Sequence, residues 1–115
     1  MEHKTHNLKF KIVNSDIFEA IKKSKKKVET RAATVRYRDI KAGDTVRFVC
    51  GDKKFEKKVS GVKIFRTITA MLKKYKAKEI NPNVNSNKEL RDLYYSFSGY
   101  REKINKYGLI VLELK

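Results

Sequence analysis

Hydrophobic and polar residues alternate over residues 7–13, which is the pattern of a half-buried β-strand. Leu8, Phe10 and Ile12 fall on one face, and Lys9 and Lys11 fall on the other, because successive side chains of a strand point to opposite faces. The sequence therefore predicts a first strand with one apolar and one basic face.

Helical spacing replaces the alternation over residues 16–23. The apolar positions are Ile17, Phe18, Ala20 and Ile21, which recur at the intervals of one helix face. The preceding Asn14-Ser15-Asp16 offers N-cap oxygens, and Asp16 with Glu19 has the spacing of a capping box. Lysine fills the last turn, where positive charge suits the negative end of the helix dipole.

The middle of the chain is predicted to form short strands joined by turns. Three strands are expected, over residues 27–31, 45–50 and 55–65. Gly51-Asp52 joins the last two as a hairpin, and Gly61 within the final one indicates a β-bulge. Residues 32–39 are expected to be a basic loop or edge strand, and Gly43-Asp44 a turn.

The C-terminal half alternates between helical spacing and turn residues. Two helices are predicted, over residues 67–75 and 87–97, and Ser86 with Glu89 forms a capping box at the start of the second. Residues 76–87, which include Pro82, are expected to be a loop. Ser98-Gly99 ends the second helix, and residues 100–106 are expected to add another turn or two. The strongly apolar residues 108–114 are typical of a strand at the centre of its sheet.

This order of elements predicts an α+β protein, a small and mostly antiparallel β-barrel decorated by three or four helices. At 115 residues the chain is expected to form one domain, residues 1–115, around a single core. We take a monomer as the starting expectation. The chain has no apolar run of membrane-spanning length, and its N-terminus does not resemble a secretory signal. A cytoplasmic protein without membrane contact is therefore expected.

The charge balance is strongly positive, with 29 Lys and Arg residues against 13 Asp and Glu, a net charge of +16. A field of this sign attracts polyanions, RNA above all; a merely solubilising lysine-rich surface is the alternative. Basic residues interleaved with an aromatic ring suit single-stranded nucleic acid. The candidate nucleic-acid-binding residues are Lys22, Lys23, Lys25, Lys27, Arg36, Tyr37 and Arg38.

A second candidate site is the charged set Lys26, Glu29 and Arg31. Glu29 and Arg31 are two residues apart on a predicted strand, so they share one face. In a cleft, Arg31 would hold a phosphate or a developing oxyanion, and Glu29 would carry a proton. The alternative is an ion pair that only braces the sheet. Among the tyrosines, Tyr94 falls on an apolar helix stripe, whereas Tyr95 and Tyr100 are freer to line a cleft.

Other reactive residues give no pattern of a site. Cys50 lies in an apolar run, where a buried small hydrophobe is the expected role. The two histidines, His3 and His6, fall in a terminus expected to be flexible and lack a third ligand at a suitable spacing. We therefore expect no metal and no cofactor.

Two motifs resemble the ASCH domain, a branch of the PUA-like superfamily. The family signature Gly-x-Lys-x-x-Glu-x-Arg is present as Ser24-x-Lys26-x-x-Glu29-x-Arg31, and its Lys-x-Gly-Asp turn as Lys41-Ala42-Gly43-Asp44. Residues 106–114 also resemble the family's last strand. Ser24 departs from the signature glycine, which would ease a turn with positive φ after the first helix.

The resemblance implies a PUA-like barrel with a cleft beside the signature strand, lined by Lys26, Glu29 and Arg31, and work on RNA. Some ASCH-like proteins hydrolyse the amide bond of acylated cytidines, and others have been described as ribonucleases. The amide-hydrolysing members use the signature lysine with a threonine at the position of Glu29, so this chain departs from their pattern.

Three functions follow as hypotheses. The first is a protein that binds RNA or a nucleotide-like ligand through the charged cleft and its basic rim. The second is a small hydrolase that acts on a modified nucleoside or on RNA, with Lys26, Glu29 and Arg31 as catalytic residues. The third is a protein-binding module whose charge is incidental.

Overall fold

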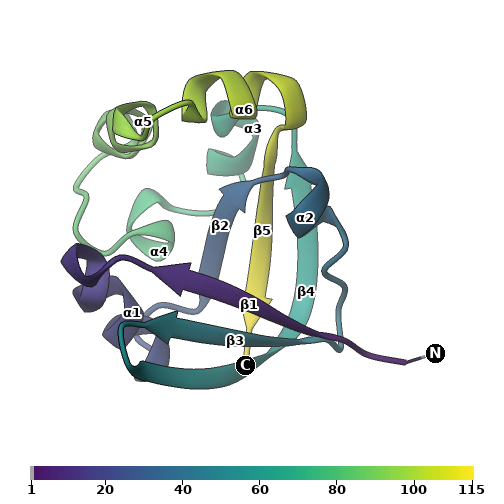
Figure 1. The fold of residues 1–115 in the computed structure, drawn as a ribbon. Coiled ribbons are helices and arrows are strands. Elements are labelled where there is room, and N and C mark those ends of the chain that lie inside the picture. Colours follow the sequence, from purple (N-terminus) through teal and green to yellow (C-terminus); the bar gives the residue numbers. More distant parts are fainter. Residues whose placement is uncertain (1) are drawn as a thin grey trace.

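The computed structural model describes residues 2–115 and has the α+β architecture expected from the sequence (Figure 1). In chain order its elements are β1 (Thr5–Phe10), the 3₁₀-helix η1 (Ile12–Asn14), α1 (Ser15–Lys22), β2 (Val28–Ala32), α2 (Val35–Arg38), β3 (Thr45–Cys50), β4 (Lys53–Phe65), α3 (Ile68–Leu72), α4 (Ala77–Ile80), α5 (Asn87–Ser96), α6 (Tyr100–Tyr107) and β5 (Leu109–Leu114). No helix in this part of the chain is long and apolar enough to span a membrane.

The prediction of three or four helices was too low, because the described residues contain six α-helices. The helix α2 lies where a basic loop or edge strand was expected, and α4 lies in a segment expected to be a loop. Both helices are four residues long. A single turn is too short to produce helical periodicity in the sequence.

The five strands form one sheet in the order β1-β3-β4-β5-β2, curled into a half-barrel. The strands β1 and β3 are parallel, and the other three pairs are antiparallel. The long strand β4 pairs with β3 through its first half and with β5 through its second half. The register shifts between Val59 and Gly61, which confirms the predicted bulge at the position where the sheet bends.

The strand β5 separates two hydrophobic clusters, which explains its apolar sequence. Leu109 and Val111 belong to the cluster under α3, α4, α5 and α6. Ile110 and Leu112 point the other way, into the cluster that packs β1, β3 and α1. Because both faces of β5 are buried, the predicted central position of residues 108–114 is confirmed.

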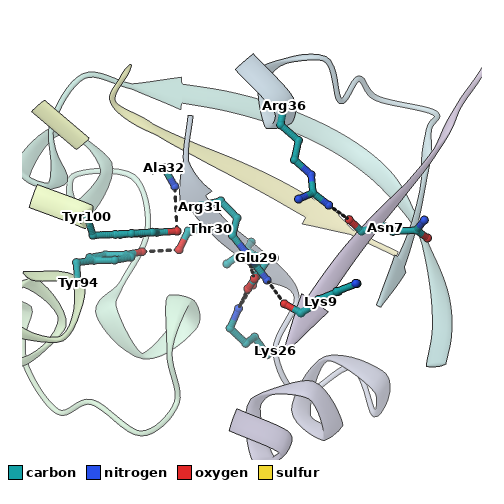
Figure 2. A network of polar contacts seen from close by, with 11 residues as sticks. Asn7, Lys9, Lys26, Glu29, Thr30, Arg31, Ala32, Arg36, Tyr94 and Tyr100 are labelled. Carbon is teal, nitrogen blue, oxygen red and sulfur yellow. Dashed lines mark hydrogen bonds and ion pairs between the residues drawn. The ribbon is translucent and has the colours of Figure 1, made fainter. Parts of the chain in front are cut away.

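The two edges of the half-barrel, β1 and β2, are connected by arginine side chains. Arg31 on β2 donates from Nη2 to the carbonyl oxygen of Lys9 at 3.3 Å, and Arg36 on α2 donates to that of Asn7 at 3.1 Å. Both acceptors are main-chain groups of β1 (Figure 2). Guanidinium groups therefore satisfy part of the free edge of β1 in place of another strand.

Asp44 fixes the turn between α2 and β3 to the first strand. Its carboxylate accepts hydrogen bonds from the backbone N–H groups of Lys4 and Lys41, both at 3.0 Å, and from His6 Nε2 at 2.8 Å. Gly43, with φ of +94°, adopts the left-handed conformation within this turn. His6 therefore lies on β1 and is held by Asp44, so the expectation of a flexible segment there was wrong.

The two predicted capping boxes differ in outcome. At α5, Ser86 Oγ accepts from the N–H of Glu89 at 3.1 Å, as expected, although Glu89 itself accepts from Asn85. At α1, the N-cap Asn14 makes no side-chain capping bond. Asp16 instead accepts from the side chain of Asn83 at 2.6 Å, so a contact distant in sequence replaces the local cap.

We predict that Asp44→Asn destabilises the protein and alters its acid unfolding. Burial alone would raise the pKa of Asp44, but its three hydrogen bonds outweigh this and lower the pKa to about 2. The stabilisation by the Asp44 carboxylate is thus complete above its ordinary pKa of 3.8 and is lost as the pH falls towards 2. Urea unfolding at pH 7 should show a loss of roughly 1–3 kcal/mol.

The difference between wild type and Asp44→Asn should shrink as the pH is lowered from about 4 towards 2. Asp52→Asn removes the same charge from an exposed turn and is the matched control. A pH-independent difference for Asp44→Asn, or an equal loss in the control, would contradict this account of the turn.

Candidate functional site

The segment before β2 begins in a tight turn that directs Lys26 into the protein. After α1, Ser24 adopts φ of +60°, a left-handed conformation that glycine adopts more readily than other residues. The N–H groups of Lys25 and Lys26 both donate to the carbonyl oxygen of Ala20, at 2.9 and 3.0 Å. Ser24 therefore forms a tight turn with positive φ, and the chain enters β2 with the Lys26 side chain buried.

The backbone of β2 alternates between its partner strand and its open edge. Lys27 O accepts from Leu114, and the N–H of Ala33 donates to Gly108, both at 2.9 Å. In this antiparallel register, odd-numbered residues of β2 exchange hydrogen bonds with β5, and the peptide groups of even-numbered residues face away from it. Val28, Thr30 and Ala32 therefore present N–H and C=O groups at the open edge.

Lys26, Glu29 and Arg31 meet at this edge as one ion network (Figure 2). Lys26 Nζ donates to Glu29 Oε1 at 2.8 Å and also to the carbonyl oxygen of Val28. Arg31 Nε donates to Glu29 Oε2 at 2.9 Å. The side chains of Lys26, Glu29 and Arg31 are 2%, 7% and 18% exposed. The three residues predicted as a site are thus brought together.

The network keeps Glu29 ionised. Burial alone would raise the pKa of the Glu29 carboxyl, but the ammonium of Lys26 and the guanidinium of Arg31 outweigh burial and lower the pKa below its usual value. Each carboxylate oxygen accepts a bond from one of the two cations. A carboxylate in this state is a weak proton acceptor, and an ammonium engaged by it has no lone pair for nucleophilic attack.

A cleft of about 1000 Å³ lies directly over the open edge of β2. Its floor includes Lys26, Glu29, Thr30 and Arg31. One wall comes from β1 and the segment up to α1, and the other from α4, α5 and α6 together with their connecting loops. The charged network is therefore neither sealed in the core nor spread over the surface, because it forms the bottom of an open hollow.

The helical wall of the cleft is aromatic. The rings of Tyr94 and Tyr100 stack at 6.3 Å with an interplanar angle of 9°, and Phe97 meets Tyr100 edge to face at 5.4 Å. The Tyr94 hydroxyl pairs with Thr30 Oγ1, and the Tyr100 hydroxyl accepts from the N–H of Ala32 at 3.3 Å. Burial raises the pKa of both hydroxyl groups, which remain neutral phenols.

Phe97 is the residue of this wall that sequence reasoning missed as a functional candidate. It follows α5, is 41% exposed and lines the cleft. Its position directly before the Ser98-Gly99 break was the available signal, because a ring at the end of a helix is free to turn out of the core. Of the tyrosines expected to line a cleft, Tyr100 does so, whereas Tyr95 packs against the guanidinium of Arg101.

The opposite wall is basic and contains residues that the sequence analysis did not select as a site. Lys9 and Lys11 are exposed there and line the cleft, together with the exposed Val13. Lys103 contributes a further cation from α6. The β1 side of the cleft therefore carries cations opposite the aromatic rings of the helical wall, and the helical wall itself also carries Lys103, Glu89 and Asp92.

The basic residues selected from the sequence do not line the cleft. Lys22, Lys23, Lys25 and Lys27 are exposed around the end of α1 and the start of β2, and Lys25 and Lys27 border a separate hollow of about 110 Å³. Arg36 and Arg38 donate to backbone carbonyls, Arg38 to those of Ala33 and Tyr107. Tyr37 lies under the guanidinium groups of Arg31 and Arg36. These arginines brace the fold.

The remaining reactive residues are structural. Cys50 is buried, as expected, and its thiol contacts the carbonyl oxygen of Lys11. His3 and His6 both approach Asp44. Within residues 2–115, no group of three or more His, Cys, Asp or Glu side chains is arranged to hold a metal ion.

We predict that Glu29→Gln unfolds at markedly lower urea concentration than wild type. The amide leaves the buried cations Lys26 and Arg31 without a counter-charge, which costs about 3–5 kcal/mol when one partner of a buried ion pair is removed. Glu56→Gln is the matched control, because Glu56 also binds an arginine, Arg47, but is 50% exposed. The control should lose at most about 1 kcal/mol, and equal losses in both variants would contradict the ion network as a structural centre.

The fold is shared with two proteins of known structure. The crystal structure of hypothetical protein PH0355 matches 99% of this chain and 98% of that one, with 30% identity and a TM-score of 0.81. The solution structure of protein PF0455 from Pyrococcus furiosus matches 100% of this chain and 96% of its own, with 30% identity and a TM-score of 0.72. No family model and no curated protein matches the chain. The chain belongs to the same protein family as PH0355 and PF0455.

Proposed function

We propose that the cleft binds RNA or a nucleotide-like ligand, one nucleotide at a time, with the base against the aromatic wall and the phosphate against the basic wall. The observation that carries the proposal is the pairing of Phe97 and Tyr100 on one side with Lys9 and Lys11 on the other. These are the two kinds of group that a nucleotide requires, a flat apolar surface and a cation, and they face one another across the floor of β2.

The size and lining of the cleft fit this ligand. Its volume of about 1000 Å³ lies at the upper end of the range for small-molecule sites. Aromatic side chains bind single-stranded nucleic acid by stacking on its bases, whatever their sequence. The exposed ring of Phe97 is available for such stacking, whereas Tyr94 is buried and supports the wall from behind.

The basic residues supply attraction at two ranges. Lys9, Lys11 and Lys103 lie at the cleft and would pair with the phosphate. The excess of positive charge over the whole chain, +16, draws a polyanion towards the protein before it reaches the cleft. In this proposal Lys22, Lys23, Lys25 and Lys27 contribute to the field and to the approach of RNA.

The ionisation and hydrogen bonding of the charged residues on the cleft floor favour binding over hydrolysis. A hydrolase built on Lys26, Glu29 and Arg31 needs a proton acceptor or a neutral amine. Glu29 instead has a lowered pKa and accepts from both cations. We therefore assign the network the role of a rigid floor whose cationic groups, Lys26 and Arg31, face the ligand.

We predict that Phe97→Ala weakens the binding of a short single-stranded RNA about tenfold or more, because stacking of one base on a ring contributes roughly 1–3 kcal/mol. Fluorescence anisotropy with a labelled octanucleotide at low salt measures this. Ile64→Ala is the matched control, since Ile64 is 43% exposed, like Phe97 at 41%, and does not line the cleft. Unchanged affinity for Phe97→Ala would exclude the aromatic wall as the base site.

We also predict that the paired substitution Lys9→Ala and Lys11→Ala reduces both affinity and its dependence on salt. Each lost phosphate contact lowers the slope of log K against log salt by about 0.7 for a single strand, so the slope should fall by up to about 1.4. The pair Lys22→Ala and Lys23→Ala removes the same charge outside the cleft and should have the smaller effect. A larger effect from the second pair would move the binding surface to the end of α1.

A further inference from the structure

We infer that the cleft recognises the hydrogen-bonding edge of a nucleobase through the backbone N–H and C=O groups of Thr30. This inference rests on the proposed nucleotide binding and adds how the base is recognised. It makes the specificity of the site a property of the main chain at the open edge of β2, and not of the charged side chains beside it.

The register of β2 against β5 determines which way the peptide groups of Thr30 point. Thr30 lies opposite Val111 in the antiparallel pair with β5, at a position whose peptide groups face away from β5. Its N–H and C=O therefore point to the open edge, and Thr30 lines the cleft. Among the contacts of residues 2–115, neither group has a hydrogen-bond partner within the protein.

The neighbouring edge positions are already occupied, which limits what can bind. The carbonyl oxygen of Val28 accepts from Lys26 Nζ, and the N–H of Ala32 donates to the Tyr100 hydroxyl. A peptide strand that added to β2 would need these groups as well as those of Thr30. Lys26 and Tyr100 therefore block strand addition. The N–H of Val28 also faces the open edge, but Val28 does not line the cleft, so the peptide groups of Thr30 are the adjacent donor and acceptor there, the width of one small planar group.

The chemistry of the free pair matches a nucleobase. In an extended residue the N–H and C=O point in the same direction, so a donor lies beside an acceptor. The pairing edge of each RNA base also carries an acceptor beside a donor, such as O4 and N3–H of uracil, whereas ribose and phosphate carry no such planar pair. The ring of Tyr100 lies beside this position, with its hydroxyl on the N–H of Ala32 (Figure 2).

Two methylated isomers of uridine 5′-monophosphate test the inference. The 3-methyl isomer loses the N3–H donor and places a methyl group on the pairing edge, whereas the 5-methyl isomer carries its methyl group on the opposite edge. We expect the unmodified and 5-methyl nucleotides to bind with equal affinity. The 3-methyl isomer should bind about tenfold more weakly, because it leaves a buried polar group unpaired.

The amide of Thr30 provides a direct measurement in the ¹⁵N-labelled full chain. On titration with the tightest-binding of the four mononucleotides, the Thr30 amide proton should shift downfield. The amide of Arg31, which faces β5, is the internal control. Ribose 5-phosphate should leave the Thr30 amide in place. If AMP, CMP or GMP binds more tightly than UMP, the uridine isomers do not probe the preferred base. The shift of the Thr30 amide proton then tests whether the backbone of Thr30 recognises the base.

The outcomes separate this inference from the proposed function. Nucleotide binding with equal affinity for both methyl isomers, or with no selective shift of the Thr30 amide, overturns base recognition by the backbone and leaves nucleotide binding intact. No binding of any mononucleotide or RNA removes both proposals. Thr30→Val keeps the backbone and loses only the hydroxyl paired with Tyr94, so a loss of the isomer preference in this variant assigns recognition to the side chain and overturns the inference.

Discussion

The Glu29 carboxylate, buried between Lys26 and Arg31, is the interaction on which the rest of the site depends. It connects three parts of the chain, because Lys26 belongs to the turn after α1, Glu29 to β2, and Arg31 reaches the carbonyl oxygen of Lys9 on β1. A charge at this depth is stable only when its counter-charges remain in place. The cleft floor and the link between the sheet edges are therefore held by the same network.

The two sheet edges solve one physical problem in different ways. An open strand edge carries unpaired N–H and C=O groups that invite pairing with another chain. On β1, Arg31 and Arg36 cover these groups. On β2, Lys26 and Tyr100 cover the positions on either side of Thr30 and leave its peptide groups facing the cleft. In the proposed function, the side chains that cover the edge of β2 also define the binding position.

The charge of the whole chain and the charge of the cleft have separate consequences. The chain carries a net charge of +16, whereas the residues that line the cleft include both signs: Lys9, Lys11, Lys26, Arg31 and Lys103 against Asp16, Glu29, Glu89 and Asp92. Long-range attraction is set by the sum of all charges and is weakened by salt. In the proposed function, selectivity in the cleft depends instead on shape, aromatic surface and hydrogen-bond positions, which the net charge does not reveal.

The sequence by itself determined the features that depend on neighbours along the chain. Period-two spacing placed Glu29 and Arg31 on one face of a strand, Gly61 marked the bulge, and the apolar residues 108–114 indicated the central strand. The tertiary structure alone decided that Lys9, Phe97 and Tyr100 surround β2, and that Arg36 donates to the carbonyl oxygen of Asn7 on β1. Tyr100 and Ala32 are 68 residues apart. Local periodicity fixes which way a side chain points from its own element, but which distant element it meets depends on how the whole chain packs.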